Sequence, residues 1–281
     1  MNQAGKNQER AGWHWVPAIY LIAAYSVMTG LVMLAVETVK RQTSAVMTGL
    51  PEELLPWHGL ALVVTGVLVI ALLMRKLKAR AAWELILGIA LFLGVWFYAM
   101  LILPMAWALA AASALTILQA TVRRALIHNV FILAGAVGVA LNLAFALSDK
   151  TIIVILVGLA IYDIFAGRPG GVAAEFAASL VHRGIIPGLI VPDRWRDVVA
   201  DIHAAIRRAD ASLLGVGDLI LPLAVVARAA AYGSGRALIV AAGILAAAGW
   251  LGSRGAGRPF PALIPLAAGS VIPYLFFVIF K

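Results

Sequence analysis

Nine apolar runs, each close to the length of a membrane span, divide this chain of 281 residues. An α-helix needs about 20 apolar residues to cross a bilayer, with about 17–25 usual. Hydrophobic residues make up 63% of the chain and charged residues 12%, whereas soluble domains average about 25% charge. The sequence therefore predicts an all-α polytopic membrane protein. The expected spans are 15–36, 57–74, 83–103, 105–121, 126–147, 152–167, 213–232, 237–251 and 261–280.

Basic residues in the gaps between the runs predict the orientation. Of the 22 Lys and Arg residues, 16 fall on the side of the amino terminus, 5 fall on the other side, and Arg228 lies within the seventh run. The positive-inside rule then places the amino terminus in the cytoplasm and the carboxyl terminus outside, which we expect to be across the plasma membrane. This asymmetry explains the net charge of +9 better than nucleic acid does, so no nucleic acid is expected as a partner. Arg228 is expected to extend to the outer face.

Two regions are expected along the chain. Residues 1–147 hold five spans and are expected to form an amino-terminal scaffold. Residues 148–281 hold the other four spans, and two of these carry acidic residues, so this part is expected to be the catalytic region. Its long loop, 168–211, lies on the cytoplasmic side in this orientation.

The loop itself contains three local patterns. Residues 171–183 have the pattern of a short amphipathic helix at the membrane interface. Residues 185–191 are rich in β-branched side chains and are followed by Pro192, which predicts a short strand. Asp193 is then expected to cap a further helix that includes Trp195.

Two acids lie inside apolar runs, where a bare carboxylate costs several kcal/mol and is seldom accidental. Asp163 lies four residues before the end of the sixth run. Asp218 ends the sequence GVGD and lies five residues after the start of the seventh run. At about 1.5 Å per residue, their depths are roughly 6 and 8 Å below the same membrane surface. The two acids are therefore expected to form one site.

Paired carboxyl groups suit acid–base chemistry on water. Two carboxyls held close share one proton, because both cannot ionise cheaply. The charged member can take a proton from water while the neutral member donates to a substrate carbonyl; which aspartate acts as the base stays open, because the pair titrates jointly. The same pair would suit a proton-coupled transporter or channel, and an inactive chaperone or tether is a third possibility. Cysteine is absent and no HExxH pattern occurs, so neither a metal nor a cofactor is expected.

Three short motifs carry a resemblance to a known family. They are Tyr162–Asp163 in the sixth run, GVGD at Gly215–Asp218 in the seventh, and Pro261–Ala262–Leu263 at the start of the ninth. In this order they resemble the signatures of the presenilin and signal peptide peptidase family, the GxGD intramembrane aspartyl proteases. The chain also lacks a long hydrophilic insert, which is typical of the microbial, presenilin-like members.

The resemblance implies a function and a set of site residues. Asp163 and Asp218 would be the catalytic pair of an endopeptidase that cuts transmembrane or signal-peptide-like helices within the lipid bilayer. The residues that would support the site are Tyr162, Gly215, Gly217, Pro261, Ala262 and Leu263. Whether partner subunits are needed stays open.

The expected loop strand offers a hypothesis for substrate binding. A protease must unwind a helix before it can cut it, and an unwound segment could add to the edge of a strand. The residues that would bind it are Ile185, Ile186, Leu189, Ile190 and Val191. The alternative is a linker that only joins two helices.

Overall fold

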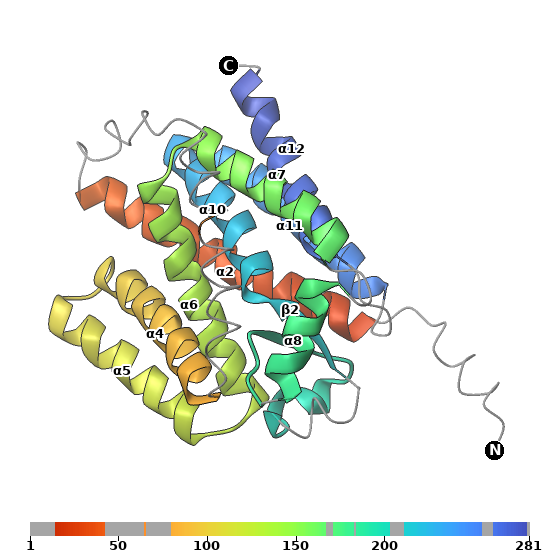
Figure 1. Cartoon of the computed structure of the whole chain (residues 1–281). Coiled ribbons are helices and arrows are strands. Elements are labelled where there is room, and N and C mark those ends of the chain that lie inside the picture. The colour runs from red at the N-terminus through yellow and green to blue at the C-terminus, as the bar shows by residue number, and fades with distance from the viewer. Residues whose placement is uncertain are drawn as a thin grey trace.

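The computed structural model describes residues 15–42, 65, 80–166, 171–182, 184–202, 211–254 and 261–279. In this part of the chain the fold is all-α apart from one two-stranded sheet (Figure 1). The helices are α2 (Trp15–Gln42), α4 (Arg80–Met100), α5 (Met105–Thr121), α6 (Ala125–Ala146), α7 (Asp149–Ala166), α8 (Val172–His182), α10 (Val216–Tyr232), α11 (Ser234–Ser253) and α12 (Leu263–Ile279).

Eight of these helices coincide with expected spans, which confirms the all-α polytopic prediction for the described residues. Every end but one agrees within three residues; α2 continues from the expected end at 36 to Gln42. The expected span 57–74 lies, apart from residue 65, outside the described residues. Among the described helices, α2, α4, α6 and α11 are long and apolar enough to cross a membrane.

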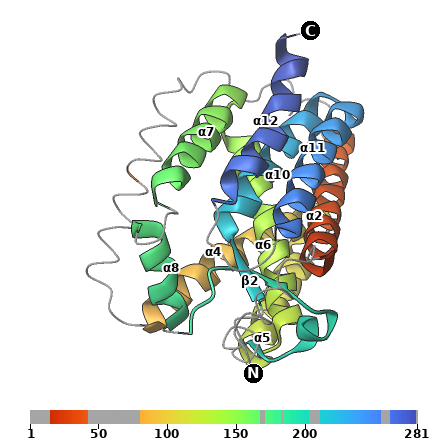
Figure 2. The same cartoon turned by 90° about the vertical axis from the view of Figure 1, so that its right-hand side faces the viewer.

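Helix α10 is the centre of the packing. It contacts α2, α6, α7, α11 and α12, and Figure 2 shows it behind α12 and beside α11. Every residue from 221 to 230 is buried, and all of them except Arg228 are apolar, as expected for a helix at the centre of a bundle. The position of its amino-terminal turn, which carries Asp218, is therefore fixed by helices from both halves of the chain.

Small residues allow the helices to cross closely. Helices α4 and α6 meet at Gly94, Gly135 and Gly138, and a Cβ atom at Gly138 would overlap the carbonyl oxygen of Gly94. A second crossing joins Gly243 of α11 to Gly269 of α12 in the same way. Close backbone contact stabilises the helix pair by dispersion attraction. This matters in a bilayer because the lipid tails are as apolar as the helices, so the hydrophobic effect does not drive the helices together.

The sheet joins the two acid-bearing helices. Strand β1 (Gly188–Pro192) pairs antiparallel with β2 (Ala211–Gly215), with Gly188 opposite Gly215 and Pro192 opposite Ala211. The predicted strand at 185–191 is thus present, but it begins later and includes Pro192, which occupies a position where no ladder donor is needed. Strand β2 was expected to be the first part of a span; its residues pair with β1 instead, so α10 begins only at Val216.

The other loop predictions have mixed outcomes. The amphipathic helix is confirmed as α8. The helix expected after Asp193 does not begin there: Trp195–Val199 forms one 3-10 turn with Arg194 as its cap, and residues 203–210, over which that helix was expected to continue, lie outside the described residues. After this turn the backbone contacts the start of α6, where the N–H of Ala125 donates to the carbonyl oxygen of Ala200 at 3.0 Å.

We predict that Gly138→Ala destabilises the protein by about 1–3 kcal/mol, because the added methyl group forces α4 away from α6. Thermal unfolding in detergent measures the change. The matched control is Gly88→Ala in α4, where a Cβ atom meets nothing within 4 Å, so its melting temperature should stay the same or rise. Equal melting temperatures for the two variants would contradict the close crossing.

Candidate functional site

Three helix ends meet around the two aspartates. Asp163 lies in the last turn of α7, which ends at Ala166, and Asp218 lies in the first turn of α10. Helix α12 begins at Leu263, next to Asp163. The carboxylates of Asp163 and Asp218 are within electrostatic range of each other. The structure therefore brings together the two acids that the apolar runs singled out.

The contact on Asp163 comes from the backbone of α12. The N–H of Leu263 donates to Oδ2 of Asp163 at 3.3 Å. This N–H is one of the first in its helix, which have no partner within the helix and carry partial positive charge. The sequence Pro261–Ala262–Leu263 thus reaches the site through a main-chain donor.

Asp218 is held by the start of its own helix. Gly215 is the N-cap of α10, and its backbone N–H interacts with the Asp218 carboxylate, as the acid of a capping box does. A Cβ atom at Gly215 would lie 3.2 Å from Oδ2 of Asp218, whereas one at Gly217 would meet nothing within 4 Å. Gly215 therefore makes room for the folded-back carboxylate, and the space beside Gly217 is open.

Tyr162 stands apart from these contacts. Its side chain is 43% exposed, while the neighbouring Asp163 is half-buried. A role for Tyr162 in supporting Asp163 therefore stays a prediction.

The outer edge of β1 is occupied by helix α6. The Nε2–H of His128 donates to the carbonyl oxygen of Gly188 at 3.0 Å. The amide of Asn129 donates to the carbonyl oxygen of Ile190 at 2.7 Å and accepts from its N–H at 2.9 Å. The amide also donates to the hydroxyl of Tyr20 in α2 at 2.6 Å. Asn129 thus replaces a third strand on β1.

This arrangement determines which strand edge points outward. Gly188 and Ile190 use their polar groups on α6, so by the alternation of an antiparallel ladder Leu189 and Val191 bond to β2. The residue opposite Ile190 is Leu213, whose N–H and carbonyl must then point away from β1. The outward edge of the sheet is accordingly β2, directly before Asp218 in the chain.

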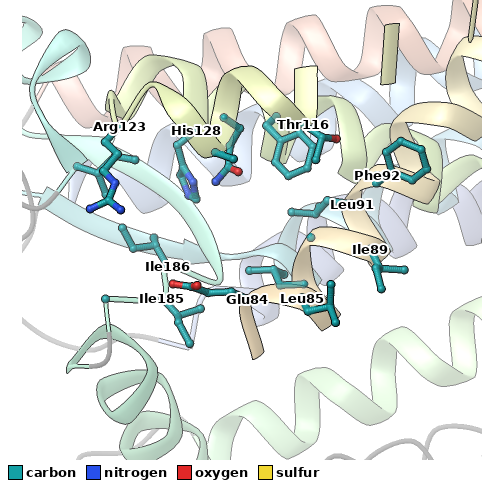
Figure 3. Close-up of a pocket in the computed structure, with 17 residues that line it drawn as sticks. Glu84, Leu85, Ile89, Leu91, Phe92, Thr116, Arg123, His128, Ile185 and Ile186 are labelled. Carbon is teal, nitrogen blue, oxygen red and sulfur yellow. The ribbon is translucent and has the colours of Figure 1, made fainter. Parts of the chain in front are cut away.

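A cavity of about 490 Å³ lies elsewhere, between α4, α5, α6 and the chain at 184–186 (Figure 3). Ile185 and Ile186, two of the expected substrate-binding residues, line this cavity, and its lining does not include the aspartates. The other three, Leu189, Ile190 and Val191, have exposures of 0%, 1% and 2%. None of the five side chains therefore presents an open surface beside the two acids.

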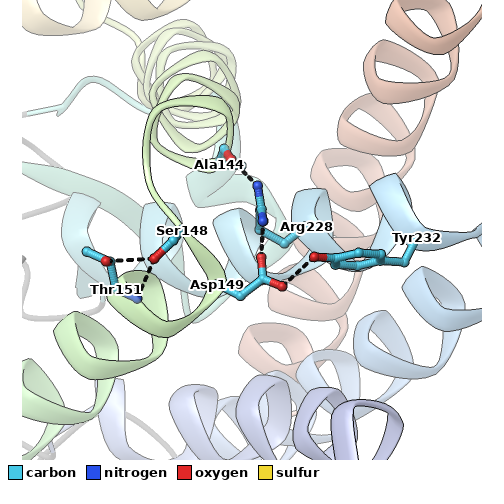
Figure 4. Close-up of polar contacts among 6 residues, drawn as sticks. All are labelled: Ala144, Ser148, Asp149, Thr151, Arg228 and Tyr232. Atoms are coloured by element: carbon cyan, nitrogen blue, oxygen red, sulfur yellow. Dashed lines mark hydrogen bonds and ion pairs between the residues drawn. The ribbon is translucent and has the colours of Figure 1, made fainter. Parts of the chain in front are cut away.

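Arg228 corrects an expectation. It does not extend to the outer face: it is 5% exposed and forms an ion pair with Asp149 at the start of α7. Asp149 also accepts from the hydroxyl of Tyr232 at 2.6 Å, and Arg228 donates to the carbonyl oxygen of Ala144 at 3.3 Å (Figure 4). A buried guanidinium needs a charged partner, so this cluster ties α7 to α10 at the ends remote from Asp163 and Asp218.

Four residues that shape the site were not predicted from the sequence: His128, Asn129, Gly188 and Tyr25. The hydroxyl of Tyr25 donates to the main-chain carbonyl oxygen of Asp218 at 2.9 Å. Asn129 and Tyr25 are polar groups within apolar runs, which was the available signal. A Cβ atom at Gly188 would overlap the carbonyl oxygen of Leu214, which no sequence pattern indicates. Among the described residues, no three His, Cys, Asp or Glu side chains gather as metal ligands would.

Known structures share this architecture. Two crystal structures of a presenilin family intramembrane aspartate protease, in space groups C222 and P2, match with TM-scores of 0.58 and 0.56. Their sequence identities are 20% and 19%, and the matches cover 92% and 95% of this chain and 99% of each of those chains. No protein-family model and no curated protein sequence matches the chain. The chain therefore has a presenilin-like fold.

We predict that Asn129→Ala lowers the free energy of unfolding by about 2–4 kcal/mol, because both polar groups of the buried Ile190 lose their partner. Hydrogen exchange should also accelerate at the Ile190 amide. Asn142→Ala, an exposed position of the same helix, is the control and should change neither quantity. Unchanged exchange at Ile190 in Asn129→Ala would show that Asn129 does not hold β1.

Proposed function

We propose that this protein is an intramembrane aspartyl endopeptidase, with Asp163 and Asp218 as its catalytic pair. The observation that carries the proposal is that the two carboxylates, at the end of α7 and at the start of α10, lie within electrostatic range of each other. The presenilin-like fold supports it. The amino-terminal ends of α10 and α12 both point at this position, where their partial positive charge favours a carboxylate.

The reaction needs only the two carboxyl groups and water. One carboxylate removes a proton from a water molecule, and the resulting hydroxide attacks the carbonyl carbon of the scissile peptide. The other, protonated, carboxyl donates its proton to the carbonyl oxygen, which gives a tetrahedral diol. The diol collapses as the C–N bond breaks: the nitrogen takes a proton from the carboxyl that received one from water, and the other carboxylate takes back one hydroxyl proton of the diol. The products are a carboxylic acid and an amine, and the carboxyl pair returns to its starting state.

The surroundings favour a substrate that is itself a membrane helix. The acids lie at the ends of the apolar helices α7 and α10, and β2 leads directly to Asp218. We expect single-span or signal-peptide-like helices as substrates and the bilayer as the setting. The amino terminus would lie in the cytoplasm, as the positive-inside rule requires.

An unwound substrate would add to the outer edge of β2. This refines the hypothesis that it pairs with 185–191, because β1 has β2 on one edge and Asn129 on the other. Pairing at Leu213 would supply the substrate with a backbone donor and acceptor, and it would align the following substrate residues with Gly215 and Asp218. Strand β1 would then stiffen β2 from behind.

Replacing either aspartate by alanine should lower cleavage of a synthetic transmembrane peptide at least about 10³-fold. The fold should persist, because each substitution removes one of two carboxyl groups that cannot both ionise cheaply at close range. The assay uses purified protein in detergent, with mass spectrometry of the products and thermal unfolding as a check on the fold. Glu175→Ala, which changes an exposed acid of α8, should cleave at the wild-type rate.

The same assay separates a protease from a transporter. If the wild type leaves the peptide intact but moves protons or solute across vesicles in an Asp218-dependent manner, the acid pair serves transport and the protease proposal is wrong. Cleavage that survives both alanine substitutions would also contradict it.

A backbone test addresses the edge of β2. Leu213→Pro removes an N–H that points away from β1, so the sheet should stay intact while substrate pairing is lost. We expect cleavage to fall about tenfold or more, with an unchanged melting temperature. Leu213→Val keeps the N–H and is the control; wild-type cleavage by Leu213→Pro would exclude pairing at this edge.

A further inference from the structure

A buried tyrosine from the first described helix reaches the backbone of Asp218. The hydroxyl of Tyr25 in α2 donates to the main-chain carbonyl oxygen of Asp218 at 2.9 Å. Tyr25 is 0% exposed and is among the largest fully buried side chains. This hydrogen bond joins residues 193 positions apart, and it connects the amino-terminal part of the chain to the first turn of α10.

The carbonyl that Tyr25 binds is one that α10 cannot satisfy itself. In an α-helix the carbonyl of residue 218 accepts from the N–H of residue 222. Residue 222 is Pro222, which lies inside α10 and has no N–H; a helix-interior proline also pushes against the carbonyl four residues before it. A buried carbonyl without a donor costs about 1–3 kcal/mol, and the Tyr25 hydroxyl supplies the missing donor.

Asp218 is thereby fixed at two points. Its carboxylate interacts with the backbone N–H of Gly215, and its main-chain carbonyl accepts a hydrogen bond from Tyr25. Because Pro222 has no N–H, the first turn of α10 lacks one internal hydrogen bond, and the hydrogen bond from Tyr25 connects this turn to α2.

We propose that Tyr25 is a positioning residue for Asp218: its hydroxyl replaces the helix hydrogen bond that Pro222 removes and so sets the direction of the Asp218 carboxylate toward Asp163. The inference rests on the proposed protease function. Tyr25 acts through the backbone and takes no proton in the reaction.

The test is a double-mutant cycle on kcat and KM. Tyr25→Phe removes only the hydroxyl and should lower kcat about tenfold with little change in KM, because the substrate edge is untouched and the acid is misplaced. Pro222→Ala restores an N–H to the helix, so Asp218 recovers an internal donor. In the Pro222→Ala background, Tyr25→Phe should therefore lower kcat by less than about twofold. Tyr98→Phe, a half-buried tyrosine of α4, is the control and should keep wild-type kcat.

Two outcomes overturn the inference. The first is a wild-type kcat for Tyr25→Phe. The second is that Tyr25→Phe lowers kcat by the same factor in the wild-type and in the Pro222→Ala background, because the loss would then come from general packing. A wild type that does not cleave at all overturns the proposed function instead. In that case the melting temperatures of the wild type, the two single variants and the double variant are compared. A smaller drop in melting temperature on Tyr25→Phe in the Pro222→Ala background supports the hydrogen-bond replacement, and equal drops refute it.

Discussion

Carboxylates in apolar surroundings need donors, and here the ends of helices provide them. Asp163 and Asp218 lie where α7 stops and α10 starts, and the first N–H of α12 reaches Asp163. Helix ends are the places in a bundle where the main chain has free N–H groups. The packing of the remaining helices fixes where these three ends meet, so the site depends on contacts distributed across the chain.

Those contacts fall into two groups. Close crossings at glycine, such as Gly94 on Gly138, set the distances between helices. Polar groups then fix the ends: Arg228 with Asp149 joins α7 to α10 at one end, and Tyr25 holds the turn of Asp218 at the other. Each polar pair satisfies a group that would otherwise be buried without a partner, which makes the arrangement specific.

The loop between α7 and α10 is a structural extension of the site. Strand β1 is fastened to α6 by Asn129 and His128, and β2 pairs with β1 and continues into α10. Strand β2 ends three residues before Asp218, so a displacement of β2 would also move Asp218. Binding of an extended substrate and placement of the acid are coupled in this proposal.

Much of this architecture could be predicted from the sequence because the signals are local. Apolar run lengths located eight of the described helices, and the rise per residue of a helix placed Asp163 and Asp218 at matching levels. Contacts between distant segments could not be predicted: Tyr25 and Asn129 had the appearance of ordinary polar residues within spans. Arg228 was expected to extend outward, because its partner Asp149 lies outside the expected span. Strand β2 was assigned to a span because its leucines are as apolar as those of a helix.

The proposed site requires that the side chains at 163 and 218 face each other in the membrane. The chain has no cysteine, so Asp163→Cys combined with Asp218→Cys gives a clean test with a short bifunctional thiol reagent in native membranes. We expect an intramolecular cross-link, detected as two peptides joined in one product after digestion, and we expect no cross-link when the second cysteine is introduced as Glu175→Cys instead. If the 163–218 pair fails to cross-link although each thiol is shown to react singly, the two side chains do not face each other.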